Sequence, residues 1–105
     1  MDEAWIELID SLAADVRKAA SYAKESSMSE GILNGLDTSL KGMEELKPLI
    51  KKKVHFKRIR ADLKDVVGEL LESSEKGDEN TTMGNMRTLR DRVNVLKALI
   101  SRDQD

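Results

Sequence analysis

Apolar side chains recur at steps of three and four residues in four separate segments of this chain. The four sets are Trp5, Ile9, Leu12, Val16, Ala19, Ala20 and Ala23; Ile32, Leu36, Leu40, Met43 and Leu46; Phe56, Ile59, Leu63, Val66, Val67, Leu70 and Leu71; and Met86, Leu89, Val93, Leu96 and Ile100. This spacing places each set on one face of an α-helix, and such a face is stable only when other helices cover it. We therefore predict an all-α fold, an antiparallel up-down four-helix bundle.

The predicted bundle is a single domain spanning residues 1–105, because a chain of 105 residues has the usual length of one domain. Its helices are expected at about residues 2–25, 28–47, 54–75 and 82–101. The alternative is a three-helix bundle with the fourth helix exchanged in a dimer. A sheet protein is disfavoured, because aromatic residues, which strands favour, make up only 3% of the chain.

The predicted helix ends follow from local signals. Ser27 with Glu30 forms a possible capping box for the second helix, and Pro48 should end or kink that helix. Leu49 and Ile50 then either begin the third helix or cover the end of the bundle. Gly77 is a stop signal for the third helix, residues 77–81 are expected to form a loop, and Thr81 or Thr82 should cap the fourth helix.

Three glycines, Gly31, Gly35 and Gly42, fall on one flank of the second apolar face. Each costs about 1 kcal/mol relative to alanine in a helix interior. One explanation is a close contact of Gly31 and Gly35 with the alanines near the end of the first helix, Ala19, Ala20 and Ala23. The other is that the second helix is intrinsically weak.

Residues with catalytic or metal-binding chemistry are scarce. The chain has no cysteine and one histidine, which excludes thiolate chemistry and a di-iron site of the kind found in bundles. His55 lies between Lys53 and Lys57 and is interpreted as a surface or turn residue. We predict no catalytic residues, no metal site and no cofactor, and hence a protein that is not an enzyme. Trp5 is interpreted as a structural anchor of the core.

The expected location is cytoplasmic, because the chain starts with acidic residues and no apolar run approaches the ~18 residues of a membrane span. The basic run at residues 51–60 is also compatible with a nuclear-localisation signal.

Positive charge is concentrated in residues 47–64. Eight of the 18 Lys and Arg residues lie there: Lys47, Lys51, Lys52, Lys53, Lys57, Arg58, Arg60 and Lys64. With Asp62 as the only acid, this segment carries +7, and the rest of the chain carries -9. In a bundle these residues should form a basic cap at one end, with Lys57, Arg60 and Lys64 along one edge of the third helix. Helix-dipole and solubility effects explain two or three such cations but not eight.

The predicted function is therefore that of a non-enzymatic helical adaptor that docks on another macromolecule through this basic cap. A protein partner with an acidic surface is favoured, and homo-oligomerisation is possible. Two alternatives are a nucleic-acid-associated factor that binds phosphates with little sequence specificity, and a peripheral module that binds anionic membrane lipids. In the membrane alternative, Leu49 and Ile50 would supply the apolar contact beside the cations.

Overall fold

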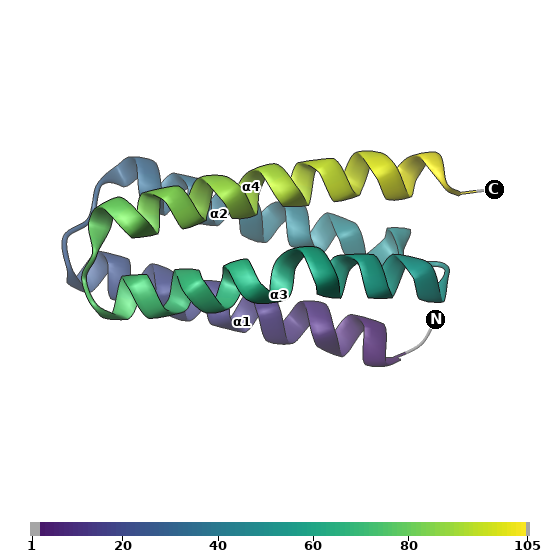
Figure 1. Cartoon of the computed structure of the whole chain (residues 1–105), viewed down its shortest axis with the longest axis horizontal. Coiled ribbons are helices and arrows are strands. Elements are labelled where there is room, and N and C mark those ends of the chain that lie inside the picture. The colour runs from purple at the N-terminus through teal and green to yellow at the C-terminus, as the bar shows by residue number, and fades with distance from the viewer. Residues whose placement is uncertain (1–2, 105) are drawn as a thin grey trace.

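Residues 3–104 are described by the computed structural model, and they form a four-helix bundle (Figure 1). The elements are α1 (Glu3–Glu25), α2 (Glu30–Leu46), the short 3₁₀-helix η1 (Lys47–Leu49), α3 (Lys53–Glu75) and α4 (Glu79–Arg102). The predicted all-α bundle is confirmed. Because α4 packs on α2 and α3 of its own chain, the bundle is complete without exchange of a helix.

The helices alternate in direction, but the connection between α2 and α3 crosses the end of the bundle diagonally. The close pairs are α1 with α2, α1 with α3, α2 with α4, and α3 with α4. Two of these pairs, α1/α3 and α2/α4, therefore run parallel. The turns α1–α2 and α3–α4 lie at one end, and the α2–α3 connection lies at the other end with both termini (Figure 1).

The apolar faces expected from the sequence meet in one continuous core. Its largest fully buried side chains are Ile9, Ile32, Leu36, Met43, Leu46, Ile50, Ile59, Leu63, Leu70, Met86, Leu89 and Leu96. Ile50 is 1% exposed and lies just after η1, which contacts α1, α2 and α4. The connection thus covers the end of the bundle, after Pro48 has ended α2 as predicted.

Two helices end in a Schellman motif, in which one residue adopts a left-handed conformation and two backbone N–H groups bond back to the last turn. At the end of α3 that residue is Gly77 (φ +74°), whose N–H donates to Ser74 O at 3.1 Å. At the end of α1 it is Ser27 (φ +53°), whose N–H donates to Lys24 O at 3.0 Å. The predicted capping box on Ser27 is therefore wrong, because Ser27 belongs to the preceding turn. Ser29 caps α2 instead, and its Oγ accepts from Ile32 N–H at 3.4 Å.

The start of α4 also differs from the expectation. Asp78 is the N-cap, and its Oδ1 accepts the Thr81 N–H at 3.2 Å. The predicted loop at residues 77–81 shrinks to a tight turn, since α4 already begins at Glu79. Thr82, predicted as a possible cap, is fully buried. The glycine of the Schellman motif thus ends α3, and the aspartate that follows it begins α4.

The glycines of α2 face α4, so the predicted contact with the alanines of α1 is wrong. A Cβ added to Gly35 would lie 2.1 Å from Met86 Sδ, and one added to Gly42 would lie 2.6 Å from Val93 Cγ1. The α2 backbone therefore accepts two α4 side chains at positions where any larger residue would overlap them.

Candidate anion-binding surface

Seven of the eight predicted cations lie in the α2–α3 connection and the first half of α3, and the eighth, Lys47, begins η1. The α2–α3 connection and the start of α3 lie at the end of the bundle that carries the termini (Figure 1), and Arg60 and Lys64 follow further along α3. The eight cations fall into two groups, according to whether an acidic side chain of the chain itself reaches them.

Three of the eight are held by acids of the chain itself. Lys47 pairs with Asp10 of α1 and, at 3.0 Å, with Glu44 of α2. Its hydrogen bond to Asp10, with a smaller contribution from Glu44, raises the pKa of the Lys47 ammonium. Lys47 therefore joins the connection to two helices, which is a structural role.

The other two held cations are Lys52 and Arg58. Lys52 Nζ lies 3.2 Å from Asp103 Oδ1 at the end of α4, and Arg58 Nε lies 3.4 Å from Asp62 Oδ2 on α3. The Lys52 pair links the connection to α4, whereas the Arg58 pair is local to α3.

The remaining five cations are exposed, and none forms an ion pair within residues 3–104. Lys51 lies in the connection. Lys53, Lys57, Arg60 and Lys64 follow one another at steps of four, three and four residues, so they lie along one edge of α3. We call these four residues the basic row. It lines a shallow open groove with Phe56, Ala61 and Asp65.

A second groove runs between α1 and α3, beside the basic row. Its floor includes Leu8, Leu12 and Phe56, and Gly68 lies at its far end. The α3 wall is formed by Arg60 and Lys64, and the α1 wall carries Glu7 and Asp15. None of these four charged residues pairs with another within the bundle. The groove therefore has an apolar floor, one basic wall and one acidic wall.

Phe56 was expected in the core but is only half-buried, with Trp5 packed on it. The two rings stack with centroids 6.3 Å apart and an interplanar angle of 26°. Trp5 is likewise half-buried and packs against the core, in agreement with its interpretation as an anchor. The stacked pair joins the start of α1 to the start of α3.

His55 is buried, so its interpretation as a surface or turn residue is wrong. Its Nδ1 accepts the Lys51 N–H at 3.2 Å, and its Nε2 lies 2.9 Å from Asp103 Oδ2. With Nδ1 acting as acceptor, the ring hydrogen is assigned to Nε2 and donates to Asp103. Hydrogen bonds from His55 and then Lys52 lower the pKa of the Asp103 carboxyl. His55 therefore connects the end of α4 to the α2–α3 connection.

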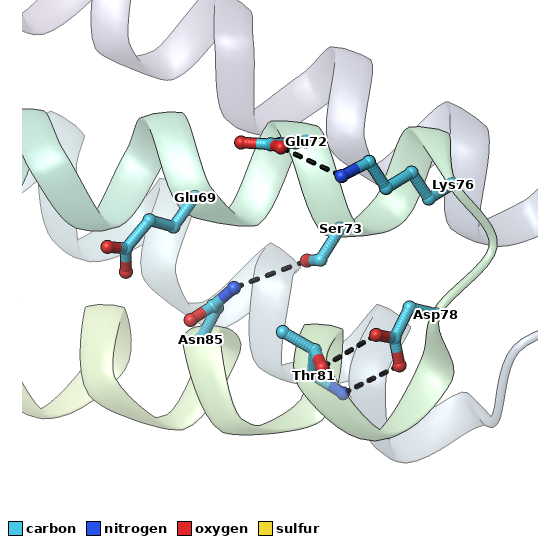
Figure 2. A pocket seen from close by; sticks show the side chains of 7 residues that line it. All are labelled: Glu69, Glu72, Ser73, Lys76, Asp78, Thr81 and Asn85. Carbon is cyan, nitrogen blue, oxygen red and sulfur yellow. Dashed lines mark hydrogen bonds and ion pairs between the residues drawn. The ribbon is translucent and has the colours of Figure 1, made fainter.

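A polar notch of about 210 Å³ between α3 and α4 is another concave feature with several functional groups (Figure 2). Ser73 Oγ donates to Leu70 O at 3.1 Å and accepts from Thr82 Oγ1 at 3.0 Å and from Asn85 Nδ2 at 3.2 Å. Ser73 is thereby fixed to its own helix and to α4. The Glu72–Lys76 pair and the Asp78 cap form the rim of the notch (Figure 2). The hydrogen bonds from Thr82 and Asn85 to Ser73 hold α3 and α4 together at the notch.

Within the described residues, no group of three or more His, Asp or Glu side chains is arranged to hold a metal ion. None of the described helices is long and apolar enough to cross a membrane.

Sequence reasoning missed three features of this end of the molecule. His55 lies four residues before Ile59 and continues the apolar face of α3, so its burial had a detectable signal. Its partner Asp103 had none, because the two residues are 48 positions apart. The acidic wall at Glu7 and Asp15 was also missed, since it depends on which helix lies beside α3.

Comparison of the chain with protein-family models, with curated proteins and with solved structures gave no match.

Proposed function

We propose that this protein is a non-enzymatic interaction module whose basic row docks on an acidic surface of a protein. The observation that carries the proposal is the row of four exposed cations on α3, none of which pairs with an acid within residues 3–104. Lys51, in the adjacent connection, extends the same positive surface. The held cations Lys47, Lys52 and Arg58 are assigned to the fold rather than to the partner.

The basic row is unfavourable for the isolated chain. Lys53 and Lys57, Lys57 and Arg60, and Arg60 and Lys64 are neighbours on one helix edge. Each like-charge pair of this kind costs roughly 0.2–0.5 kcal/mol. No ion pair within residues 3–104 compensates for these repulsions, whereas an anionic partner in contact with the row would.

Some cations elsewhere on the surface are paired with acids, whereas others, such as Lys18 and Arg87, form no ion pair among the described residues. Lys41, Lys76 and Lys97 reach Asp37, Glu72 and Glu45 at 3.2, 2.9 and 2.8 Å, respectively. Each of these three paired cations stands alone on its helix edge, whereas the four cations of the basic row are neighbours on one edge. The clustering of four unpaired cations on one helix edge supports a binding role for the row over a purely solubilising one.

An acidic protein surface fits the surroundings of the row better than nucleic acid does. Asp65 lines the groove along the row, and Glu7 and Asp15 face it across the α1–α3 groove. A continuous phosphate backbone laid along α3 would meet these carboxylates. A protein surface can place cations or neutral groups opposite them.

The membrane alternative loses the apolar contact on which it depended. Ile50 is 1% exposed and Leu49 is half-buried against the core, so neither is available to enter a bilayer. The exposed large apolar residues among those described are Val54 and Val95. Val54 lies on the edge of α3 away from the row, so it does not form an apolar strip beside the four cations.

The test compares the double reversal Lys57→Glu/Lys64→Glu with a control double reversal, Lys18→Glu/Arg87→Glu. The control changes the net charge equally, at exposed sites outside the cluster that form no ion pair among the described residues. Three fluorescent probes are titrated at about 50 and about 300 mM NaCl: a polyglutamate peptide, a generic DNA duplex, and vesicles containing phosphatidylserine. We expect the polyglutamate Kd to rise at least about tenfold for the row variant and less than about twofold for the control, mostly at low salt.

Equal losses from the two variants would assign binding to net charge and overturn the proposal. The absence of polyglutamate binding by the wild-type protein would overturn it too. Tighter binding of DNA or vesicles than of polyglutamate, with the same dependence on the row, would replace the acidic protein surface by one of the two alternatives.

A further inference from the structure

The α1–α3 groove is complementary in charge to itself. Its α1 wall carries Glu7 and Asp15, its α3 wall carries Arg60 and Lys64, and its floor is apolar. None of these charged groups is neutralised by an ion pair within the described chain. A surface with one acidic and one basic wall needs a partner with the same two walls in the opposite order, and a second copy of this chain is such a partner.

We propose that two copies associate through their α1–α3 faces as a symmetric dimer, in which the acidic edge of α1 of each copy covers the basic row of the other. This inference rests on the proposed function, because it names a second copy as the acidic surface that the row binds.

Symmetry determines how the two copies are oriented. A twofold axis parallel to the helices places α1 of one copy over α3 of the other, so that acids meet cations on both sides of the axis. A twofold axis across the helices places α1 over α1 and α3 over α3, so that like charges face each other. Only the first arrangement uses the charge pattern of the groove.

The heights of the charges along the bundle agree with the first arrangement, because α1 and α3 run in the same direction. Trp5 stacks on Phe56. Glu7, two residues further along α1, therefore lies at the height between Lys57 and Arg60. In the dimer, Glu7 of one copy faces these two cations of the partner. Asp15 lies eight residues beyond Glu7, near the height of Lys64 and Gly68.

Gly68 is a second, independent observation. It lies inside α3, where glycine costs about 1 kcal/mol relative to alanine. Apart from its chain neighbours and the adjacent backbone of α3, no described atom lies within 4 Å of a Cβ added there, so packing within the bundle does not require a glycine. Gly68 lines the α1–α3 groove, where it allows the backbone of a second chain to approach closely.

The proposal is tested by sedimentation equilibrium of the full chain at about 50 and about 500 mM NaCl. We expect a dimer that dissociates as the salt concentration rises. Both the acid reversal Glu7→Lys/Asp15→Lys and the base reversal Lys57→Glu/Lys64→Glu should weaken the homodimer at least about tenfold. Each of these variants alone brings like charges together at both halves of the interface.

Mixing the two reversal variants is the decisive experiment. In the mixed dimer, the new lysines on α1 of one chain face the new glutamates on α3 of the other, and the unchanged α3 cations face unchanged α1 acids. We therefore expect association to return to at least the wild-type level. The matched control is a mixture of Glu25→Lys/Glu75→Lys with Lys18→Glu/Arg87→Glu, which carries the same charges at exposed sites outside the groove. It should show no preference for mixed dimers.

A monomeric wild-type protein at about millimolar concentration would overturn the dimer, and so would failure of the two reversal variants to associate when mixed. Equal preference for mixed dimers in the control would also overturn it. If polyglutamate binding still depends on the basic row in any of these cases, the proposed function stands and only the identity of the partner is wrong. If that binding does not depend on the row, the proposed function fails as well.

Discussion

Gly42 and Gly35 lie where the α2 backbone comes closest to α4, and the identity of the facing side chain decides what a larger residue would do. Val93, which faces Gly42, is β-branched and has little rotamer freedom in a helix. Met86, which faces Gly35, is flexible but only 2% exposed. Both side chains are buried, so displacing either one disturbs the core.

We expect Gly42→Ala to destabilise the protein despite the better helix propensity of alanine. The new Cβ would lie 2.6 Å from Val93 Cγ1, and overpacking of this kind costs about 1–3 kcal/mol. Gly35→Leu should cost at least as much, because it displaces Met86. The control is Gly84→Ala on α4, where no described atom outside the adjacent helix backbone lies within 4 Å of the added Cβ. The control should gain up to about 1 kcal/mol in urea denaturation. Stabilisation by Gly42→Ala would contradict the close α2–α4 contact.

The carboxyl group of Asp103 makes the free energy of unfolding depend on pH, and the direction of its pKa shift gives the sign of that dependence. Its folded-state pKa lies below the ordinary value of 3.8, because the carboxylate accepts hydrogen bonds from His55 and Lys52. The resulting stabilisation is complete above the ordinary pKa and is lost as the pH falls through the lowered folded-state pKa. We expect Asp103→Asn to reduce the loss of thermal stability between about pH 4 and 2. Asp91→Asn, at an exposed acid of α4 without an ion pair, should leave that loss unchanged. If wild type and Asp103→Asn lost thermal stability equally at acid pH, the His55 contact would not form in solution.

At the scale of the elements, the ends of α1 and α3 have the same backbone geometry but different residues at the left-handed position. Ser27 has φ +53° and Gly77 has φ +74°. A left-handed conformation costs about 1–2 kcal/mol for a residue with a Cβ and nothing for glycine.

Substitutions at these two positions should therefore have opposite signs. We expect Ser27→Gly to raise the free energy of unfolding and Gly77→Ala to lower it, each by about 1 kcal/mol. Thermal or urea denaturation measures both changes. A cavity or clash does not account for the alanine effect, since the nearest atom to a Cβ on Gly77 is Ser26 Oγ at 3.4 Å. Changes of the same sign would rule out the shared Schellman geometry.

The helices of this bundle could be predicted from sequence because periodicity reports burial, and burial of four apolar faces leaves few arrangements. The ends were less predictable. Ser27 gave no sign that it would adopt a left-handed conformation, and Asp78 acts as a cap only because Gly77 ends α3 immediately before it. The side-by-side placement of α1 and α3 was not predictable either, since it depends on the diagonal path of residues 47–52. That placement brings Glu7 near the basic row, so the row could be read from the sequence but the groove beside it could not.

For the whole molecule, the basic row implies a trade-off between stability and binding. Replacing Lys57 by glutamate removes two repulsions, with Lys53 and Arg60, and creates two attractions in their place. We expect Lys57→Glu to raise the free energy of unfolding by about 1 kcal/mol at low salt and to weaken polyglutamate binding at the same time. Urea denaturation at two salt concentrations and a binding titration measure the two effects. Lys18→Glu is the control. It should change the free energy of unfolding and the polyglutamate Kd by much less than Lys57→Glu does. Loss of stability in Lys57→Glu would mean that the row is not a site of repulsion.

The diagonal α2–α3 connection divides the chain into two helical hairpins, α1–α2 and α3–α4, which lie side by side. Contacts within each hairpin join residues close in sequence, and chains rich in such local contacts fold quickly. Contacts between the hairpins lie along α1/α3 and α2/α4. They join residues on either side of the 47–52 connection. Substitutions at the two hairpin turns should therefore alter mainly the rate of folding, provided that the hairpins form before they dock. Substitutions at Gly35 or Gly42, where the hairpins dock, should alter mainly the rate of unfolding.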